Sequence, residues 1–228
     1  MKRYFVGITG ASGQIYAAAL IRALVRAGAA VDVSATDAGC KVLRHELGVE
    51  AGVHGELLAR NLEAWLGAEI APAVRAFDSR AVEAPPSSGT SLTGGVILCP
   101  CSMGTLARVS VGFSSNLVER AADVALKEGR PLLLVPREAP LSQIHLENLL
   151  RMARLGAVIL PASPGFYHAP RTIDDLVAHL VGKILDRLGL ANQVGARWKG
   201  LGIPAEDPGT GAPPPEDPLA PTPPEKKT

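Results

Sequence analysis

Short apolar runs alternate with amphipathic stretches along this chain, and the alternation predicts a parallel α/β fold. The runs that we interpret as strands are residues 3–8, 31–36, 81–83, 95–99, 130–136 and 157–161. The strongest of them show no polar alternation, which is typical of strands buried on both faces of a parallel sheet. We therefore expect a three-layer, doubly wound α/β fold, Rossmann-like or flavodoxin-like, with a mostly parallel sheet of about six strands.

Helices are expected between the strands, because few helix-breaking residues interrupt those stretches. Their expected ranges are 14–27, from 38 onward, 56–66, 114–129, 141–155 and 172–188. Gly28 and Gly156 suit the position after a helix end, whereas Thr36 and Ser142 suit N-caps. Residues 48–80 give no clear pattern apart from the expected helix.

Composition fits one folded domain with a tail. The chain has 228 residues, 47% of them hydrophobic, so residues 1–203 are expected to form one domain with a sizeable core. Nine prolines fall among the last 25 residues, and residues 204–228 are expected to be a disordered, Pro-rich tail. A net charge of +1 gives no support for binding to nucleic acid or to an acidic membrane surface.

Membrane insertion and secretion are not expected either. No apolar run reaches the roughly 18 residues of a membrane span, and the N-terminus lacks the apolar segment of a signal peptide. The three cysteines, Cys40, Cys99 and Cys101, have no metal-binding spacing and fit reduced thiols in the cytoplasm. The histidines show no metal-binding pattern, so no metal is assigned. Cys101 is interpreted as a packing residue, because no local base accompanies it, and His168 as structural.

A glycine-rich turn, Gly7-Ile8-Thr9-Gly10-Ala11-Ser12-Gly13, connects the first expected strand to the first expected helix. Such a turn presents backbone N–H groups at a helix N-terminus, where an anion can bind. The glycine spacing is not GxGxxG, so the dinucleotide pattern does not fit. The Thr9 and Ser12 hydroxyls suit a phosphate or the edge of a flavin. The alternative is a tight turn whose glycines only satisfy geometry.

Further polar residues lie where other strands end. Residues 100–105 follow a buried strand and open a helix, which makes them a second turn able to hold a ligand. Thr36 is either a ligand contact or only a helix cap, and the loop 84–91 either wraps a ligand or is simply solvated. Arg137 and Glu138 follow a buried strand directly. Glu138 is therefore a candidate acid/base, the alternative being a mutual ion pair that anchors the turn.

Two cations share one face of the helix expected over 114–129. Arg120 and Lys127 are seven residues apart, which places them two turns from each other on the same side. They could bind a phosphate. They could equally form ordinary surface pairs with neighbouring acidic residues of that helix.

Six segments occur in an order that matches a known family. They are Gly7–Gly13, Ala84–Gly89, Cys99–Leu106, Glu119–Glu128, Pro131–Leu141 and Gly165–His168. With them, roughly residues 3–198 resemble the UbiX-type flavin prenyltransferases, part of the flavoprotein superfamily that also holds cysteine decarboxylases. Any one segment would be a weak signal, but the ordered set is highly specific.

The resemblance implies an enzyme that transfers a dimethylallyl group from dimethylallyl monophosphate to reduced FMN, with bonds to N5 and then to C6. The product, prenylated FMN, would serve a partner decarboxylase of the UbiD type, in ubiquinone precursor or aromatic acid metabolism. The family is metal-independent and typically a homododecamer with its site at a subunit interface.

The resemblance also implies roles for individual residues. FMN would be held by Gly10, Ala11, Ser12, Thr36, Ser102, Met103, Gly104, Thr105 and Arg137. The phosphate and prenyl group of the donor would meet Ser88, Gly89, Arg120, Lys127, Tyr167 and Lys183. Glu138 would act as acid/base, and Ser12 would relay a proton near N5. The cations would stabilise the charge that develops on the leaving phosphate.

The sequence departs from the family pattern at two of these places. Val82 stands where the family often has an aromatic residue, and Lys183 where some relatives have arginine, although either cation binds phosphate. Trp198 matches a tryptophan near the family's C-terminal end. One alternative function is a flavin-dependent cysteine decarboxylase, but residues 100–104 lack the asparagine of the Pro-x-Met-Asn motif of those enzymes. The other alternative is an FMN carrier, which would not need a second phosphate site.

Overall fold

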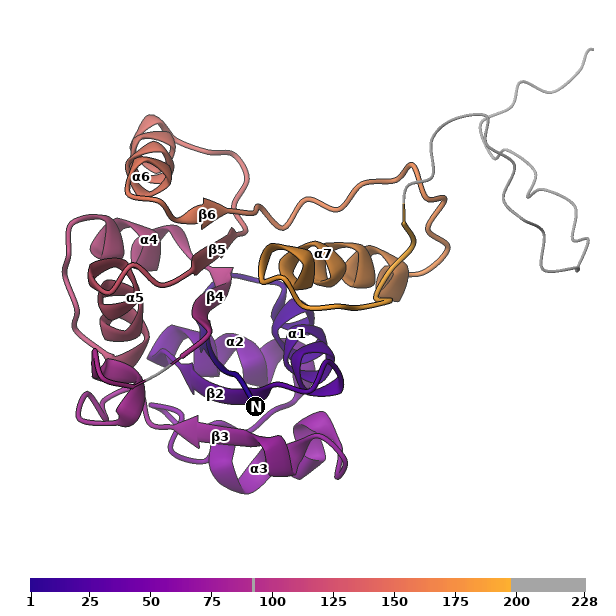
Figure 1. Ribbon diagram of the computed structural model, residues 1–228, viewed down its shortest axis with the longest axis horizontal. Coiled ribbons are helices and arrows are strands. Elements are labelled where there is room, and N and C mark those ends of the chain that lie inside the picture. Colours follow the sequence, from indigo (N-terminus) through magenta and orange to yellow (C-terminus); the bar gives the residue numbers. More distant parts are fainter. Residues whose placement is uncertain (92, 198–228) are drawn as a thin grey trace, which may run out of the picture. The chain divides into compact units, whose positions relative to one another are not determined.

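Six parallel strands form the sheet of the computed structural model, in the order β3-β2-β1-β4-β5-β6 (Figure 1). They are β1 (Arg3–Ile8), β2 (Ala30–Ala35), β3 (Val74–Phe77), β4 (Gly95–Cys101), β5 (Leu132–Pro136) and β6 (Val158–Ile159). The chain adds β2 and β3 on one side of β1 and then crosses to β4 on the other side. The strand order therefore reverses between β1 and β4, which is where doubly wound folds bind their ligands. The expected fold class is confirmed.

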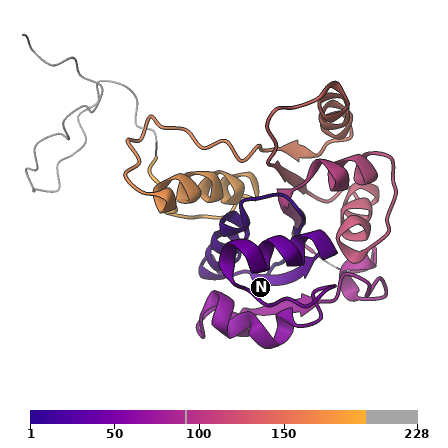
Figure 2. The same ribbon diagram turned by 180° about the vertical axis from the view of Figure 1, so that it is seen from behind.

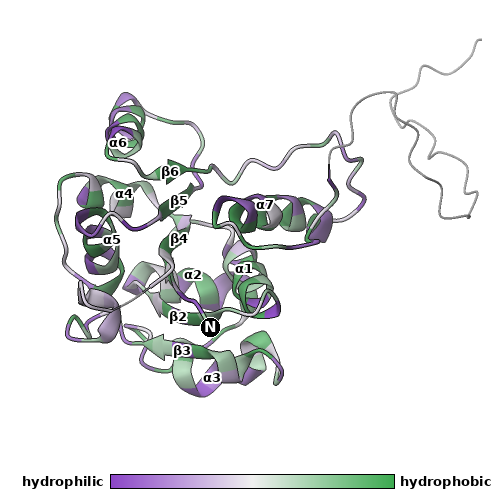
Figure 3. Cartoon of the chain, in the orientation of Figure 1, coloured by the Kyte–Doolittle hydropathy of each residue, from purple (hydrophilic) through white to green (hydrophobic). Residues whose placement is uncertain are grey.

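Helices cover both faces of this sheet. They are α1 (Gln14–Arg26), α2 (Asp37–Leu47), α3 (Leu58–Leu66), α4 (Met103–Ser110), α5 (Leu117–Lys127), α6 (Gln143–Arg154) and α7 (Ile173–Arg187). Alternate strand residues enter two separate cores: Tyr4 and Val6 of β1 pack with α1 and α7, whereas Phe5 packs with α4 and α5. Figures 1 and 2 show α7 beside α1 from both sides, and Figure 3 shows the apolar strands between half-polar helices.

The structure describes residues 1–91 and 93–197. The expected boundary at residue 203, the tail over 204–228 and Trp198 lie outside the described residues, so these predictions stay predictions. Among the described helices, none is both long enough and apolar enough to cross a membrane.

The third strand is not where the sequence pattern placed it. Residues 81–83 form a turn, with Val82 half exposed, and they pair with no strand. The third strand is instead β3, inside the segment that gave no clear pattern. It is an edge strand, and its Arg75 reaches Asp32 on the neighbouring strand, so no continuous apolar run marks it. The helix expected over 114–129 is α5, which is shorter at both ends. Asn116 caps it at the start, and Glu128 is its C-cap.

Asp32 links three strands from a buried position. Its side chain is only 3% exposed, and its carboxylate accepts hydrogen bonds from Arg3 on β1 and from both Nε and Nη2 of Arg75 on β3, each at 2.8 Å. The two arginines are partly exposed. A buried carboxylate with charged partners on both neighbouring strands holds the edge of the sheet in register.

We expect Asp32→Ala to lower the free energy of unfolding by about 2 kcal/mol. Breaking a fully buried ion pair lowers the free energy of unfolding by more than this. Here the two arginines are partly exposed, so water can solvate them once the carboxylate is removed. The control is Asp78→Ala, which removes a surface pair with Arg80 and should cost under about 1 kcal/mol. Chemical denaturation of both variants checks the difference, and equal losses would contradict the role given to Asp32.

Candidate functional site

A pocket of about 350 Å³ opens where β1, β2 and β4 end. It therefore lies at the reversal of strand order, at the carboxyl edge of the sheet. The residues that line it are Gly10, Thr36, Asp37, Ala38, His54, Ser79, Arg80, Ser102, Thr105, Arg108, Ser115 and Asn116. Four of them are residues expected to hold FMN: Gly10, Thr36, Ser102 and Thr105.

Three helices begin at this pocket. Their N-caps are Thr36 for α2, Ser102 for α4 and Asn116 for α5, and each side chain accepts a backbone N–H from its own helix, at 3.1, 3.3 and 3.0 Å. The side chains of Thr36 and Ser102 are thus helix caps. Because the N-terminus of a helix carries partial positive charge, three of them converging on one pocket favour an anion there.

The two turns that border the pocket are fixed to each other by Thr9. Its buried hydroxyl donates to the Pro100 carbonyl and accepts the Ser102 N–H, both at 2.7 Å. Gln14 holds the first turn from within, because its side-chain amide donates to the carbonyls of Thr9 and Ala11. The interpretation of Thr9 as a ligand contact is therefore wrong, since its hydroxyl is fully used inside the protein.

Glycine has a different role in each turn. A Cβ atom at Gly10 would lie 2.6 Å from the Cβ of Ala38, so Gly10 allows the turn to pack against α2. Gly104 is exposed, and a Cβ there would meet no atom closer than 3.6 Å. Packing does not require Gly104, and its bare backbone leaves room for a ligand at the first turn of α4. Ala11 and Met103 are buried, so only their backbone can face a ligand.

Beside the pocket, Ser12 is part of a polar cluster that the sequence did not reveal. The carboxylate of Glu46, near the end of α2, accepts the N–H groups of Gly13 and Gln14 at 3.0 and 2.8 Å, and it lies close to the Ser12 side chain. Burial would raise the pKa of Glu46, but these hydrogen bonds and the charge of Arg137 outweigh it, so the pKa lies below its usual value. Glu46 belongs to no motif, and no sequence signal could have singled it out.

Arg137 and Glu138 complete this edge. Arg137 Nε donates to the Ser12 carbonyl at 3.2 Å, which ties the end of β5 to the glycine turn. Glu138 is exposed, and its carboxylate accepts the N–H of Ala139 at 3.0 Å. Among the described residues the two form no ion pair with each other. Glu138 is therefore open to solvent and able to exchange protons with a ligand.

Three residues expected at the donor site lie at the opposite, amino edge of the sheet. Lys127 ends α5 just before β5 begins, and a Cβ at Gly89 would lie 3.1 Å from its Nζ. Ser88 is the neighbour of Gly89, and Arg130 binds the Gly89 carbonyl. Because β4 has seven residues at about 3.3 Å each, the two edges are about 20 Å apart. One copy of the chain does not bring these residues to Glu138.

The other expected donor residues lie on helices. Arg120 pairs with Asp123 at 2.7 Å, and Lys127 with Glu128 at 2.6 Å, as in the surface-pair interpretation. Lys183 is exposed on α7. Tyr167, in the loop before α7, packs edge-on against His179.

His168 packs against a second histidine ring, and the cysteines are buried. The ring of His168 stacks on His179 with 4.8 Å between ring centroids and 3° between ring planes. All three cysteines are buried, and burial raises the pKa of the Cys101 thiol to about 12. Such a thiol is not a nucleophile at neutral pH. Within the described residues, no group of three or more His, Cys, Asp or Glu side chains is arranged to hold a metal ion.

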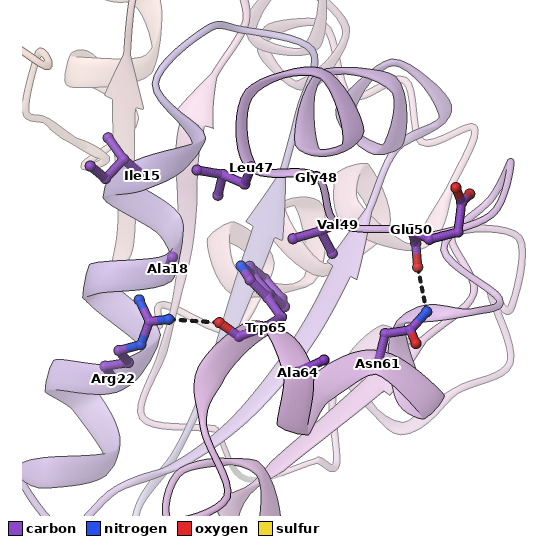
Figure 4. Close-up of a pocket in the computed structure, with 10 residues that line it drawn as sticks. All are labelled: Ile15, Ala18, Arg22, Leu47, Gly48, Val49, Glu50, Asn61, Ala64 and Trp65. Atoms are coloured by element: carbon purple, nitrogen blue, oxygen red, sulfur yellow. Dashed lines mark hydrogen bonds between the residues drawn. The ribbon is translucent and has the colours of Figure 1, made fainter.

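A second pocket, of about 360 Å³, lies between α1, the end of α2 and α3 (Figure 4). It contains none of the expected site residues. Arg22 at its wall donates to the carbonyls of Trp65 and Leu66, and Asn61 donates to the Glu50 carbonyl. These polar groups connect α1 and the loop after α2 to α3, and the candidate site is placed in the other pocket, which the expected residues line.

The fold and its pocket define the class: an α/β protein with a ligand pocket at the carboxyl edge of its sheet, where the strand order reverses. The model of the family described as Flavoprotein matches residues 1–185, so the class is narrowed to the flavoproteins. The UbiX flavin prenyltransferase of Pseudomonas aeruginosa is 45% identical over 197 residues, which are 86% of this chain and 94% of that protein. The UbiX of Methanothermobacter thermautotrophicus is 41% identical over 203 residues, 89% of this chain and 98% of that protein. The chain belongs to the UbiX family of flavin prenyltransferases.

Solved structures agree with this assignment. A dodecameric FMN-dependent UbiX-like protein of Escherichia coli O157:H7 has 39% identity and a TM-score of 0.76, covering 87% of this chain and all of its own. A UbiX protein in complex with FMN and dimethylallyl pyrophosphate has 36% identity and a TM-score of 0.77, covering 87% of this chain and 98% of its own. An FMN-dependent cysteine decarboxylase shares only the fold, at 15% identity.

Proposed function

We propose that this protein transfers a dimethylallyl group from dimethylallyl monophosphate to reduced FMN, forming bonds to N5 and then to C6. The main support is the pocket at which three helices begin, because the positive ends of these helices suit the phosphate of FMN. Gly10, Thr36, Ser102, Met103, Gly104 and Thr105 would hold that phosphate end. The flavin supplies the nucleophilic atoms of the reaction.

The residues beside the pocket suit the flavin ring and its protons. Arg137 donates a hydrogen bond to the Ser12 carbonyl on the same edge; these two residues and Ala11 would hold the ring. The Ser12 side chain lies close to Glu46, whose pKa is below its usual value, which would let the Ser12 hydroxyl relay a proton near N5. Glu138, exposed beside Arg137, is our acid/base for the departing phosphate and for the later proton movement.

We propose that the donor site is completed by other copies of the chain. Ser88, Gly89 and Lys127 lie about 20 Å from Glu138 across the strands, so only an assembled protein can unite them. Large apolar side chains are exposed on α6 and around Tyr167: Ile144 is 67%, Phe166 70% and Ile173 71% exposed. Such surface favours association. A homododecamer, as in the Escherichia coli relative, would bring Arg120, Lys127, Tyr167 and Lys183 to one phosphate.

The test is the mass of the flavin after reaction. Purified protein is incubated without oxygen with FMN, a reductant and dimethylallyl monophosphate, and a parallel sample receives the diphosphate. We expect the flavin to gain one C5H8 unit with the monophosphate while inorganic phosphate is released. An unchanged flavin on a folded, FMN-loaded protein would contradict prenyl transfer and favour an FMN carrier.

The wider role is also a proposal. Prenylated FMN made here would serve a decarboxylase of the UbiD type, in ubiquinone precursor or aromatic acid metabolism. The buried, unpaired cysteines suit a reducing cytoplasm. Adding the reaction product to a cofactor-free UbiD-type decarboxylase should restore decarboxylation.

A further inference from the structure

Arg108 projects a guanidinium group into the pocket proposed for the FMN phosphate. It belongs to the last turn of α4, and its side chain extends back along the helix towards the N-terminus. Its Nη2 lies 3.4 Å from Thr105 Oγ1, and its Nη1 lies 3.6 Å from the position that a Cβ would take on Gly104. Both neighbours are residues expected to contact FMN.

A buried carboxylate holds this guanidinium in place. Glu119 of α5 is fully buried and accepts a hydrogen bond from Arg108 Nε. Its second oxygen accepts the N–H and the hydroxyl of Ser115 at 2.9 and 2.7 Å. Burial would raise the pKa of Glu119, but the bonds from Ser115 and Arg108 outweigh it, so the pKa lies below its usual value and the group is ionised.

The geometry leaves part of Arg108 available to a ligand. A guanidinium has five N–H groups; Nε is directed to Glu119, whereas Nη1 is bonded to no described residue. The side chain is 42% exposed, on the pocket side. Of the pocket's other charged residues, Arg80 pairs with Asp78 and Asp37 lies 2.7 Å from His54 Nδ1. Arg108 is distinguished by its place in the lining, because its guanidinium lies against Gly104 and Thr105 in the first turn of α4.

We infer that Arg108 binds the phosphate of FMN and so makes the pocket select FMN over riboflavin, with Glu119 as its positioning residue. This inference rests on the FMN binding proposed above. Two donors on a fixed planar group match the oxygens of a phosphate better than backbone N–H groups alone. Preorganisation by Glu119 removes the entropy cost of ordering a long side chain.

The test compares the affinities of FMN and riboflavin by flavin fluorescence. We expect Arg108→Gln to weaken FMN binding about ten- to a hundredfold, the range for a lost hydrogen bond to a charged group, and to change riboflavin binding less than about twofold. The control is Arg44→Gln, which alters an exposed pair with Glu50 and should change neither affinity. Arg108→Lys should restore part of the FMN affinity, because the positive charge returns.

The outcomes separate this inference from the proposed function. If the parent protein binds no FMN, the proposed function fails. If the parent binds FMN and Arg108→Gln binds it equally well, or loses both flavins equally, only the role of Arg108 is overturned. Because Arg108→Gln leaves Glu119 buried without its cation, the double variant Arg108→Gln/Glu119→Gln is measured too. It should fold and show the same selective loss of FMN.

Discussion

Replacing Glu138 by glutamine should slow dimethylallyl transfer by about 10²- to 10⁴-fold, the usual contribution of a positioned acid or base. The change should leave FMN affinity as it is. Glu138 is exposed, and its carboxylate is bonded only to the N–H of its own neighbour, Ala139, among the described residues. A glutamine oxygen can accept that same bond, so the turn after β5 keeps its shape while the group loses its ability to transfer protons.

The measurement is the rate at which the flavin mass changes, together with a separate FMN titration. Glu147→Gln is a suitable control, because Glu147 is an exposed glutamate of α6 that is bonded to Gln143. It should react at the parent rate. Transfer at the parent rate by Glu138→Gln would show that the acid/base assignment is wrong, and a parallel loss of FMN affinity would show that Glu138 is a binding residue instead.

Mixed assemblies of two inactive variants should regain activity. Lys127→Ala removes a donor-phosphate cation at the amino edge, and Glu138→Gln removes the acid/base at the carboxyl edge. Each variant alone should be nearly inactive. If each site takes Glu138 from one copy and Lys127 from another, random co-assembly in equal amounts leaves both residues intact in about a quarter of the sites.

The matched control is co-assembly of the parent chain with the double variant Lys127→Ala/Glu138→Gln. It should show the same fraction of intact sites if the two residues come from different copies. If both residues came from one copy, the two single variants would never complement each other, whereas this control would keep half of its sites. Co-expression with two affinity tags gives the mixed assemblies, and the flavin mass gives the activity.

Local patterns were enough to predict the fold class. The apolar run before Gly7 and the run 130–136 each became a buried strand of a parallel sheet, as expected. The N-caps Thr36 and Ser142 were also correctly placed. These features depend on residues close together in the sequence, because a strand needs an apolar run and a cap needs only the first turn of its own helix.

Edge strands carry a weaker pattern. The sequence placed a strand at 81–83, whereas β3 lies at Val74–Phe77 and contains Arg75. That arginine occupies a strand because Asp32, 43 positions earlier, accepts two hydrogen bonds from it. When the partner of a polar residue lies so far away in the sequence, the local pattern predicts a loop at that residue.

The sequence by itself determined the class of the protein: the ordered motifs identified the UbiX family, and the strand–turn–helix segments predicted two turns at one edge of a sheet. Only the tertiary structure decided what each polar group does there. In the folded chain the Thr9 hydroxyl joins the two turns. Glu46 lies beside Ser12, and Glu119 binds Arg108. Lys127 lies at the opposite edge of the sheet from Glu138. The physical reason is that the packing of elements far apart in the sequence determines which side chains contact each other. A motif contains only residues that are close together along the chain.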